Sequence, residues 1–191
     1  MSLIPAFEIG AWNLWIFLLA FLLFEALPLP LLRLIAKREM AQFCPHSTSD
    51  TGVNLTNIIW GIILLLFLTY TIFLPLQLDT AWFYAGLAIF TLGVILATIH
   101  NVNIASTPTD VPITTGLYRY SRHPIYLTTI LRLAGMGIAS ASWIFLLLPA
   151  SLLIGLIIFA GSEEHETTEQ YGDAYREYIN RTPRWIGIPK S

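Results

Sequence analysis

Long runs of apolar residues alternate with short polar stretches along almost the entire chain. A helix needs about 20 predominantly apolar residues to cross the hydrocarbon layer of a bilayer. By this criterion, transmembrane helices are predicted at residues 12–32, 55–74 and 81–99. Two further apolar windows, 125–139 and 143–160, predict a fourth and a fifth helix, although the fourth window is short and contains Arg132.

The polar stretches between these windows predict how the helices are connected. Residues 75–79 and 140–142 leave room only for tight turns, so each should join two antiparallel helices. A polar connector covers residues 40–54, a loop covers 100–123, and a charged tail with helical character follows from residue 162. The sequence therefore predicts an all-α integral membrane protein with five transmembrane helices in a single membrane domain.

Composition supports this fold class and excludes several kinds of protein. Hydrophobic residues make up 55% of the chain and charged residues 12%, whereas ordinary soluble domains are about one quarter charged. The net charge of −2 gives no sign of nucleic-acid binding. The single cysteine, Cys44, excludes an intramolecular disulfide and is a poor zinc ligand without a second cysteine. We therefore expect no metal site.

The distribution of Lys and Arg predicts the orientation in the membrane. Short loops that are rich in these residues remain in the cytosol. With five spans, nine of the ten basic residues fall on one side, and the tenth, Arg132, lies within a span. We therefore expect the N-terminus outside and the C-terminus in the cytosol. The connector, the loop and the tail would then share the cytosolic face.

Arg122 and His123 directly precede Pro124, where the fourth apolar window begins. Proline suits the first turn of a helix. The free amides and the dipole at a helix N-terminus favour an anion, so the two residues could hold a carboxylate or a phosphate. Alternatively, they only mark the membrane boundary, as basic residues at span ends often do.

Glu163 and Glu164 follow directly after the uncharged fifth window. Acidic residues at a helix C-terminal end oppose the helix dipole, and adjacent carboxylates repel each other, so the pair requires a cationic partner. An amine, a sulfonium or Arg122 would serve. The alternative is a solvated helix end that continues through Glu166 and Glu169.

Both clusters are parts of a longer ordered pattern. It begins with Gly116-Leu117-Tyr118-Arg119-Tyr120-Ser121-Arg122-His123-Pro124-Ile125-Tyr126, reaches Glu163-Glu164 after a helical hairpin, passes through Tyr171-Gly172-Asp173-Ala174-Tyr175-Arg176-Glu177-Tyr178, and closes on Thr182-Pro183-Arg184-Trp185-Ile186. This pattern resembles the isoprenylcysteine carboxyl methyltransferase family and the wider membrane methyltransferases, which include the phospholipid N-methyltransferases.

The resemblance implies an S-adenosylmethionine site within residues 100–186, at the cytosolic face, with a tunnel that opens into the bilayer. The acceptor would be a carboxylate, a thiol or an amine of a lipid-like or prenylated substrate. The cofactor-binding residues that the resemblance implies are His100, Tyr118, Arg122, His123, Tyr126, Glu163 and Glu164. Arg122, His123 and Tyr126 would also take part in catalysis. His100 has an alternative role as a polar cap at a span end.

Arg132 departs from the pattern, because relatives continue there with apolar or aromatic residues. A charge inside a span is costly and normally faces a partner or a cavity. One hypothesis assigns Arg132 to the catalytic site, where its planar guanidinium would hold an anionic head group. The other pairs it with Glu25, the only acidic residue within a predicted span. Thr128 and Thr129 should lie on its side of the helix.

Two other functions fit parts of the sequence. Sterol-reductase-like membrane enzymes share an Arg-x-Pro-x-Tyr-like segment and use NADPH, but this chain is short for that family. The Glu163-Glu164 pair would also repel a polyphosphate. The second alternative is a non-catalytic membrane binding protein of the same fold, because a fold does not determine a function.

Overall fold

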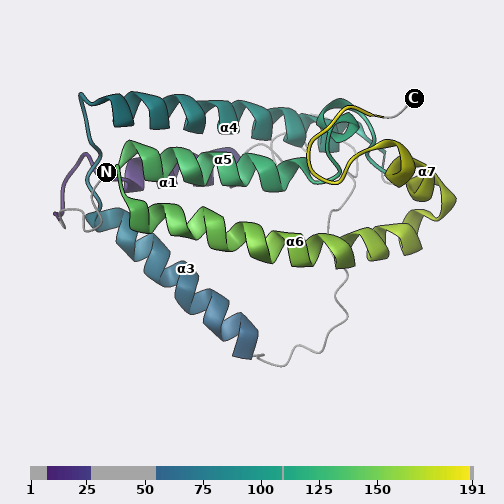
Figure 1. Ribbon diagram of the computed structural model, residues 1–191, viewed down its shortest axis with the longest axis horizontal. Helices are drawn as coiled ribbons and strands as arrows, with labels where there is room; N and C mark the ends of the chain where they lie inside the picture. The colour runs from purple at the N-terminus through teal and green to yellow at the C-terminus, as the bar shows by residue number, and fades with distance from the viewer. Residues whose placement is uncertain (1–7, 27–54, 109, 190–191) are drawn as a thin grey trace.

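A computed structural model describes residues 8–26, 55–108 and 110–189, which form helices joined by short connections (Figure 1). Within this part of the chain, the β-type pairing is limited to one isolated bridge between Asn13 and Pro75. The all-α prediction is confirmed there. The helices are α1 (Trp15–Ala26), α3 (Leu55–Phe73), α4 (Ala81–Ser106), the 3₁₀ helix η1 (Gly116–Arg119), α5 (Pro124–Ala139), α6 (Trp143–Tyr171) and α7 (Asp173–Arg181).

Hydroxyl side chains define where two of the long helices begin. The backbone amide of Phe83 donates to the Thr80 hydroxyl at 3.3 Å, at the start of α4. The amide of Phe145 donates in the same way to the Ser142 hydroxyl at 3.2 Å, at the start of α6. Threonine and serine are favoured at this position because the first amides of a helix lack backbone acceptors. Thr80 follows the first predicted turn, and Ser142 is the last residue of the second.

Helix α4 is longer than its apolar window, and the predicted end at residue 99 was wrong. The helix continues to Ser106 through a segment that the sequence assigned to a loop. His100, Asn101 and Ile104 are buried on this extension, as is Ala97 just before it. Their spacing puts them on one face of a helix, and this face packs against η1. The extension is therefore stabilised by contacts with a segment later in the chain.

Helix α6 also continues past its predicted end at residue 160. It runs to Tyr171, so the first ten residues of the predicted charged tail are helical. The hydroxyls of Thr167 and Thr168 donate to the carbonyl oxygens of Glu163 and Glu164 one turn earlier. The helix ends at Gly172, whose φ of 57° lies in the left-handed region that favours glycine.

Helices α4, α5 and α6 lie side by side in the bundle (Figure 1). Helices α5 and α6 form the predicted antiparallel hairpin, with the turn at Ser140 to Ser142. Helices α4 and α5 approach closely at Gly86. A methyl group there would collide with the backbone of Gly135 and Ala139, so the missing side chain permits the contact. The chain reverses between α3 and α4 as predicted, but α3 leans away from the bundle and does not complete a packed hairpin (Figure 1).

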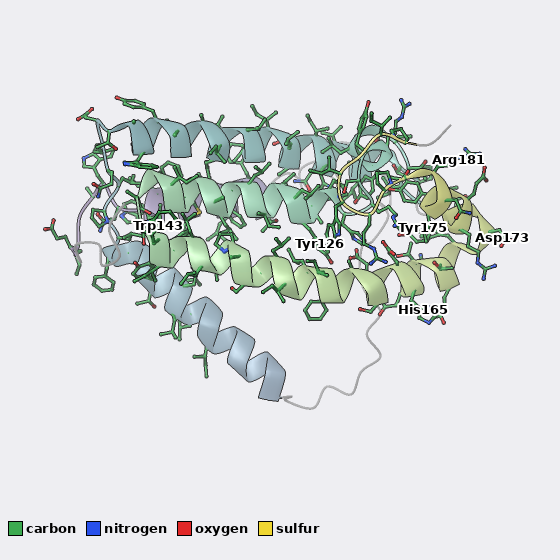
Figure 2. All side chains as sticks on the ribbon, viewed as in Figure 1. Tyr126, Trp143, His165, Asp173, Tyr175 and Arg181 are labelled. Atoms are coloured by element: carbon green, nitrogen blue, oxygen red, sulfur yellow. The ribbon has the colours of Figure 1, made fainter. Side chains whose placement is uncertain are left out.

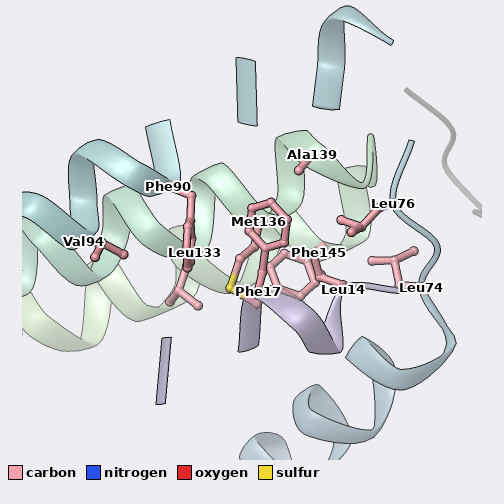
Figure 3. Close-up of a cluster of buried hydrophobic side chains, with 10 residues drawn as sticks. All are labelled: Leu14, Phe17, Leu74, Leu76, Phe90, Val94, Leu133, Met136, Ala139 and Phe145. Carbon is pink, nitrogen blue, oxygen red and sulfur yellow. The ribbon is translucent and has the colours of Figure 1, made fainter. Parts of the chain in front are cut away.

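The apolar core lies at the end of the bundle where α5 turns into α6. It joins side chains from α1, the segment before α4, and helices α4, α5 and α6 (Figure 3). Phe17 packs edge-to-face on Phe90, with ring centroids 4.8 Å apart. The buried members are Leu14, Phe17, Leu74, Leu76, Phe90, Val94, Leu133, Met136, Ala139 and Phe145.

Within the described residues, α4 and α6 are long and apolar enough to cross a membrane. Large apolar side chains remain exposed along both helices, including Leu92, Ile95, Leu147 and Ile154. Such continuous exposure suits a lipid environment better than water. The count of five spans stays a prediction. The end of the first predicted span, the connector with Cys44, and the side chain of Glu25 lie outside the described residues.

Candidate functional site

A cluster of charged side chains lies where the beginning of α5, the last turns of α6 and the segment after α7 meet. Tyr126 and Tyr175 mark two sides of this region in Figure 2. The loop before α5 and the chain after residue 162 therefore lie at one end of the bundle (Figure 1). This agrees with their predicted shared face, while the connector at residues 40–54 falls outside the described residues.

The Glu164 carboxylate is the centre of the cluster. Its Oε1 lies 3.0 Å from Arg122 Nη1 and 3.1 Å from His123 Nε2. Arg184 binds both carboxylate oxygens, through Nε to Oε1 at 3.0 Å and Nη2 to Oε2 at 2.6 Å. A two-bonded guanidinium is the strongest common partner of a carboxylate. The carboxylate in turn raises the pKa of the Arg184 guanidinium.

His123 connects the two glutamates. Its Nδ1 lies 3.2 Å from Glu163 Oε2, while its Nε2 faces Glu164. An imidazolium ring can donate to both carboxylates at once, whereas a neutral ring donates to one. The side chain is only 3% exposed, so the two carboxylates and the imidazole share a site that is largely protected from water.

Aromatic rings hold His123 on two sides. The Tyr126 ring stacks on it, with centroids 5.2 Å apart and planes at 8°. The Trp185 ring lies 5.8 Å away at 42°. The Tyr126 hydroxyl donates to Glu163 Oε2 at 2.6 Å. Tyr126 thus orients both the imidazole and one carboxylate.

Backbone hydrogen bonds attach the segment after α7 to the loop before α5. The Arg122 amide donates to the Pro183 carbonyl at 3.1 Å, and the Gly187 amide donates to the Tyr120 carbonyl at 3.0 Å. The Ser121 hydroxyl donates to the Arg184 carbonyl at 3.3 Å. We call residues 182–188 the C-terminal strap. Its main chain covers the site independently of the Arg184 side chain.

Three buried tyrosines, Tyr118, Tyr175 and Tyr178, pack together beside the loop that precedes α5. The Tyr178 hydroxyl donates to the Tyr118 carbonyl at 2.8 Å. Burial raises the pKa of Tyr178, so its hydroxyl keeps the proton that it donates. Helix α7 places both Tyr175 and Tyr178 on its buried face. The last helix therefore fixes the loop that carries Arg122 and His123.

His100 lies beside this support rather than in the ion-pair cluster. Its ring stacks on Tyr118, with centroids 5.6 Å apart. One turn later, Asn103 packs against Gly116, where any side chain would collide with it. The φ of Gly116 is 62°, which also favours glycine. These contacts explain why α4 continues past its apolar window.

Among the described residues, three polar atoms at this end are buried without a hydrogen-bond partner: His100 Nδ1, Asn103 Nδ2 and Arg122 Nε. A buried polar atom without a partner is costly and is rare in native proteins. Two of these atoms are donors, and the third belongs to an imidazole, which can donate or accept. They are suited to a ligand that carries carboxylate, hydroxyl or ring-nitrogen groups.

Arg132 is fully buried and lies six residues beyond Tyr126 on α5, or about 1.7 helical turns. Its Nε donates to the Thr128 carbonyl, and its Nη2 donates to the Thr129 hydroxyl, both at 3.3 Å. The predicted position of the two threonines is therefore correct. The guanidinium carbon also lies 4.2 Å above the Phe21 ring of α1. Arg132 belongs to the interior of the bundle and is not part of the Glu164 cluster.

The structure thus brings together five of the predicted site residues: Arg122, His123, Tyr126, Glu163 and Glu164. Tyr118 and His100 form a neighbouring layer. Reasoning from the sequence did not assign a role to Arg184 or Trp185, although both stand in the last element of the pattern. From the chain itself, the sequence analysis offered Arg122 as the cationic partner of Glu163 and Glu164. Two carboxylates call for more than one cation, and this requirement could have pointed to Arg184.

Comparison with known proteins supports the family assignment. Residues 82–174 match the phospholipid methyltransferase family model. This match confirms the resemblance to the wider membrane methyltransferases. It covers the chain from α4 to the beginning of α7, including Arg122, His123 and both glutamates, and it ends before Arg184. A search of curated proteins finds no match.

Proposed function

We propose that this protein is a membrane-embedded methyltransferase that uses S-adenosylmethionine to methylate a lipophilic acceptor. The phospholipid methyltransferase match over residues 82–174 supports methyl transfer and a lipid substrate. The observation that carries the proposal is the pairing of Glu163 and Glu164 with Arg122 and His123, where the beginning of α5 meets the last turns of α6, a helix long enough to span a membrane.

The residues present suit this cofactor. Its ammonium and sulfonium groups call for carboxylates and aromatic rings, which Glu163, Glu164 and Tyr126 supply. Its carboxylate calls for a cation with a free donor, and Arg122 Nε is buried without a partner. Its hydroxyl and adenine groups call for further polar atoms, which His100 Nδ1 and Asn103 Nδ2 offer. When bound, S-adenosylmethionine supplies a methyl group that a nucleophile displaces from its sulfur.

The chain's own contribution to the reaction is orientation, exclusion of water and control of one proton. Tyr126, Trp185 and the strap cover His123 and keep water away from the carboxylates. Rigid placement of an acceptor beside a methyl donor accounts for much of the rate in a direct displacement. A carboxylate or thiolate acceptor would need no further help, whereas an amine must lose a proton.

The geometry favours the amine among the three acceptors. Both partners of Glu163 contact its Oε2, which leaves the lone pairs of Oε1 available as a proton acceptor. Both nitrogens of His123 face carboxylates, so this ring is less suited to act as the base. We therefore assign the base to Glu163 and a positioning role to His123.

Binding measurements separate this function from its alternatives. We expect purified protein to bind S-adenosylmethionine and not NADPH, because Glu163, Glu164 and the ring of Tyr126 suit the sulfonium and ammonium groups of the methyl donor. Binding of NADPH alone would favour the sterol-reductase-like function, and binding of neither would favour a non-catalytic membrane protein. Methyl transfer to an aminophospholipid, compared with a phospholipid that lacks the amine, then tests the acceptor.

The proposed site faces the cytosol, with the N-terminus outside, because the basic residues other than Arg132 then share one side. Reporter fusions at the two termini test this orientation. Finding both ends on the same side of the membrane would contradict the five-span arrangement.

A further inference from the structure

We propose that Arg184 is an internal counter-ion that leaves Glu164 when the cationic methyl donor binds and returns when the neutral product forms. The inference rests on the proposed function and concerns how the same site exchanges its ligands. It starts from the coordination of one carboxylate.

The two oxygens of the Glu164 carboxylate are contacted unequally. Oε1 has three contacts, from Arg122, His123 and Arg184, whereas among the described residues Oε2 is contacted by Arg184. Each carboxylate oxygen has about two lone-pair positions. A sulfonium or an ammonium would therefore approach Glu164 at the less crowded Oε2, where it would meet the like charge of the Arg184 guanidinium.

Arg184 is the partner that can withdraw at the lowest cost. The Arg122 and His123 side chains are 12% and 3% exposed, whereas that of Arg184 is 41% exposed. A guanidinium that is already partly hydrated loses less when its ion pair breaks than a buried one does. The other two residues directly precede α5, and the Arg122 amide is bonded to the strap. Arg184 follows the last helix.

The movement involves the side chain and leaves the strap closed. The carbonyls of Pro183 and Arg184 accept hydrogen bonds from Arg122 and Ser121, and the Gly187 amide donates to Tyr120. None of these bonds uses the Arg184 guanidinium. The guanidinium can therefore rotate into water while the backbone continues to cover the site.

Charge balance gives the exchange a direction. The site holds two guanidinium groups, Arg122 and Arg184, beside the two carboxylates of Glu163 and Glu164. S-adenosylmethionine carries one net positive charge, from a sulfonium, an ammonium and a carboxylate. It can replace Arg184 without changing the charge of the site. S-adenosylhomocysteine has a neutral sulfur and no net charge, so Arg184 can pair again with Glu164 after methyl transfer without competing with the product.

Calorimetry with both ligands tests the exchange. Arg184→Met should bind S-adenosylmethionine roughly three- to tenfold more tightly than wild type, because the competing cation is gone. Affinity for S-adenosylhomocysteine should change by less than about twofold. Arg184→Lys retains the charge without the two-bonded contact and should give an intermediate gain, which keeps the test valid if the Met variant is unstable. Arg181→Met, which removes an exposed charge paired with Glu177 on α7, should match wild type.

Three results would overturn the inference. The first is weaker or unchanged binding of S-adenosylmethionine in both Arg184 variants, which would make Arg184 a ligand-holding or purely structural residue. The second is an equal gain for both ligands, which would indicate steric blocking rather than charge competition. The third is a wild-type protein that binds neither ligand, which would remove the proposed function as well.

Discussion

The two ends of the helical bundle are held together by different forces. At the turn between α5 and α6, aromatic and aliphatic side chains such as Phe17, Met136 and Phe145 form a dry core (Figure 3). At the opposite end, Glu164 is held by ion pairs, and the Tyr178 hydroxyl donates to a loop carbonyl. The apolar end also has a groove of about 570 Å³, lined by Ile9, Leu66, Thr69, Tyr70 and Phe73.

The apolar end contributes mainly to the stability of the fold, whereas the charged end contributes mainly to ligand binding. Apolar burial is non-directional and scales with area, so the dry core contributes mainly to the free energy of unfolding. Polar contacts contribute less net stability but depend strongly on geometry. The charged end also contains buried polar atoms without partners, which a fold optimised for stability alone would avoid. Substitutions at the two ends should therefore affect different measurements.

The largest expected effect is in the apolar core. Phe145 is 1% exposed and contacts the rings of Phe67 and Tyr70 on α3. Phe145→Ala should lower the free energy of unfolding by about 3–5 kcal/mol, because it leaves a cavity. Thermal unfolding in detergent measures the loss, and ligand affinity of the folded fraction should be unchanged. Leu147→Ala, at an exposed position of the same helix, is the control. Equal losses in both variants would contradict the assignment of stability to this core.

Arg132 lies on α5 between the apolar end and the charged end of the bundle, so its substitution tests whether it acts on stability or on ligand binding. Arg132→Met should lower the free energy of unfolding on the order of 3 kcal/mol if the guanidinium completes a buried charge pair. If Glu25 is that partner, Glu25→Gln should cause a similar loss and the double variant should recover much of it. Thermal stability of the three variants decides between this pairing and the substrate hypothesis. A folded Arg132→Met variant that binds the cofactor but loses turnover of an anionic acceptor would favour the substrate.

At the charged end, ligand affinity should change more than stability. Glu164→Gln and Arg122→Ala should each weaken S-adenosylmethionine binding by about 1.5–3 kcal/mol, or roughly tenfold to a hundredfold, because each removes a charged contact in a shielded site. Calorimetry measures this loss. Glu166→Gln changes an exposed carboxylate two residues away and should bind like wild type. Wild-type affinity in both site variants would show that the cofactor binds elsewhere.

The smallest expected effect concerns the support of the loop. Tyr178→Phe removes one hydroxyl that bonds the Tyr118 carbonyl and should cost about 0.5–1.5 kcal/mol of unfolding free energy. Thermal unfolding tests this, with the exposed Tyr120→Phe as the matched control. If Tyr178→Phe were as damaging as Phe145→Ala, the charged end would contribute as much stability as the core, and the contrast between the ends would fail.

The sequence by itself determined the helices, the tight turns and the residue types of the site. Apolar windows, the Thr80 and Ser142 caps and Pro124 act through contacts within a few residues, so local patterns are sufficient to predict them. The need of Glu163 and Glu164 for a cation is also local, because two adjacent carboxylates repel each other wherever the helix lies.

Only the tertiary structure decided how these residues meet. Arg184 and His123 reach Glu164 from positions 20 and 41 residues away in the chain. Their approach depends on the packing of α6 on α5 and on the tyrosines of α7. The extension of α4 to Ser106 likewise depends on η1. Such pairings depend on distances across the whole bundle, and hydrophobic periodicity, which acts over one or two helical turns, carries no information about them.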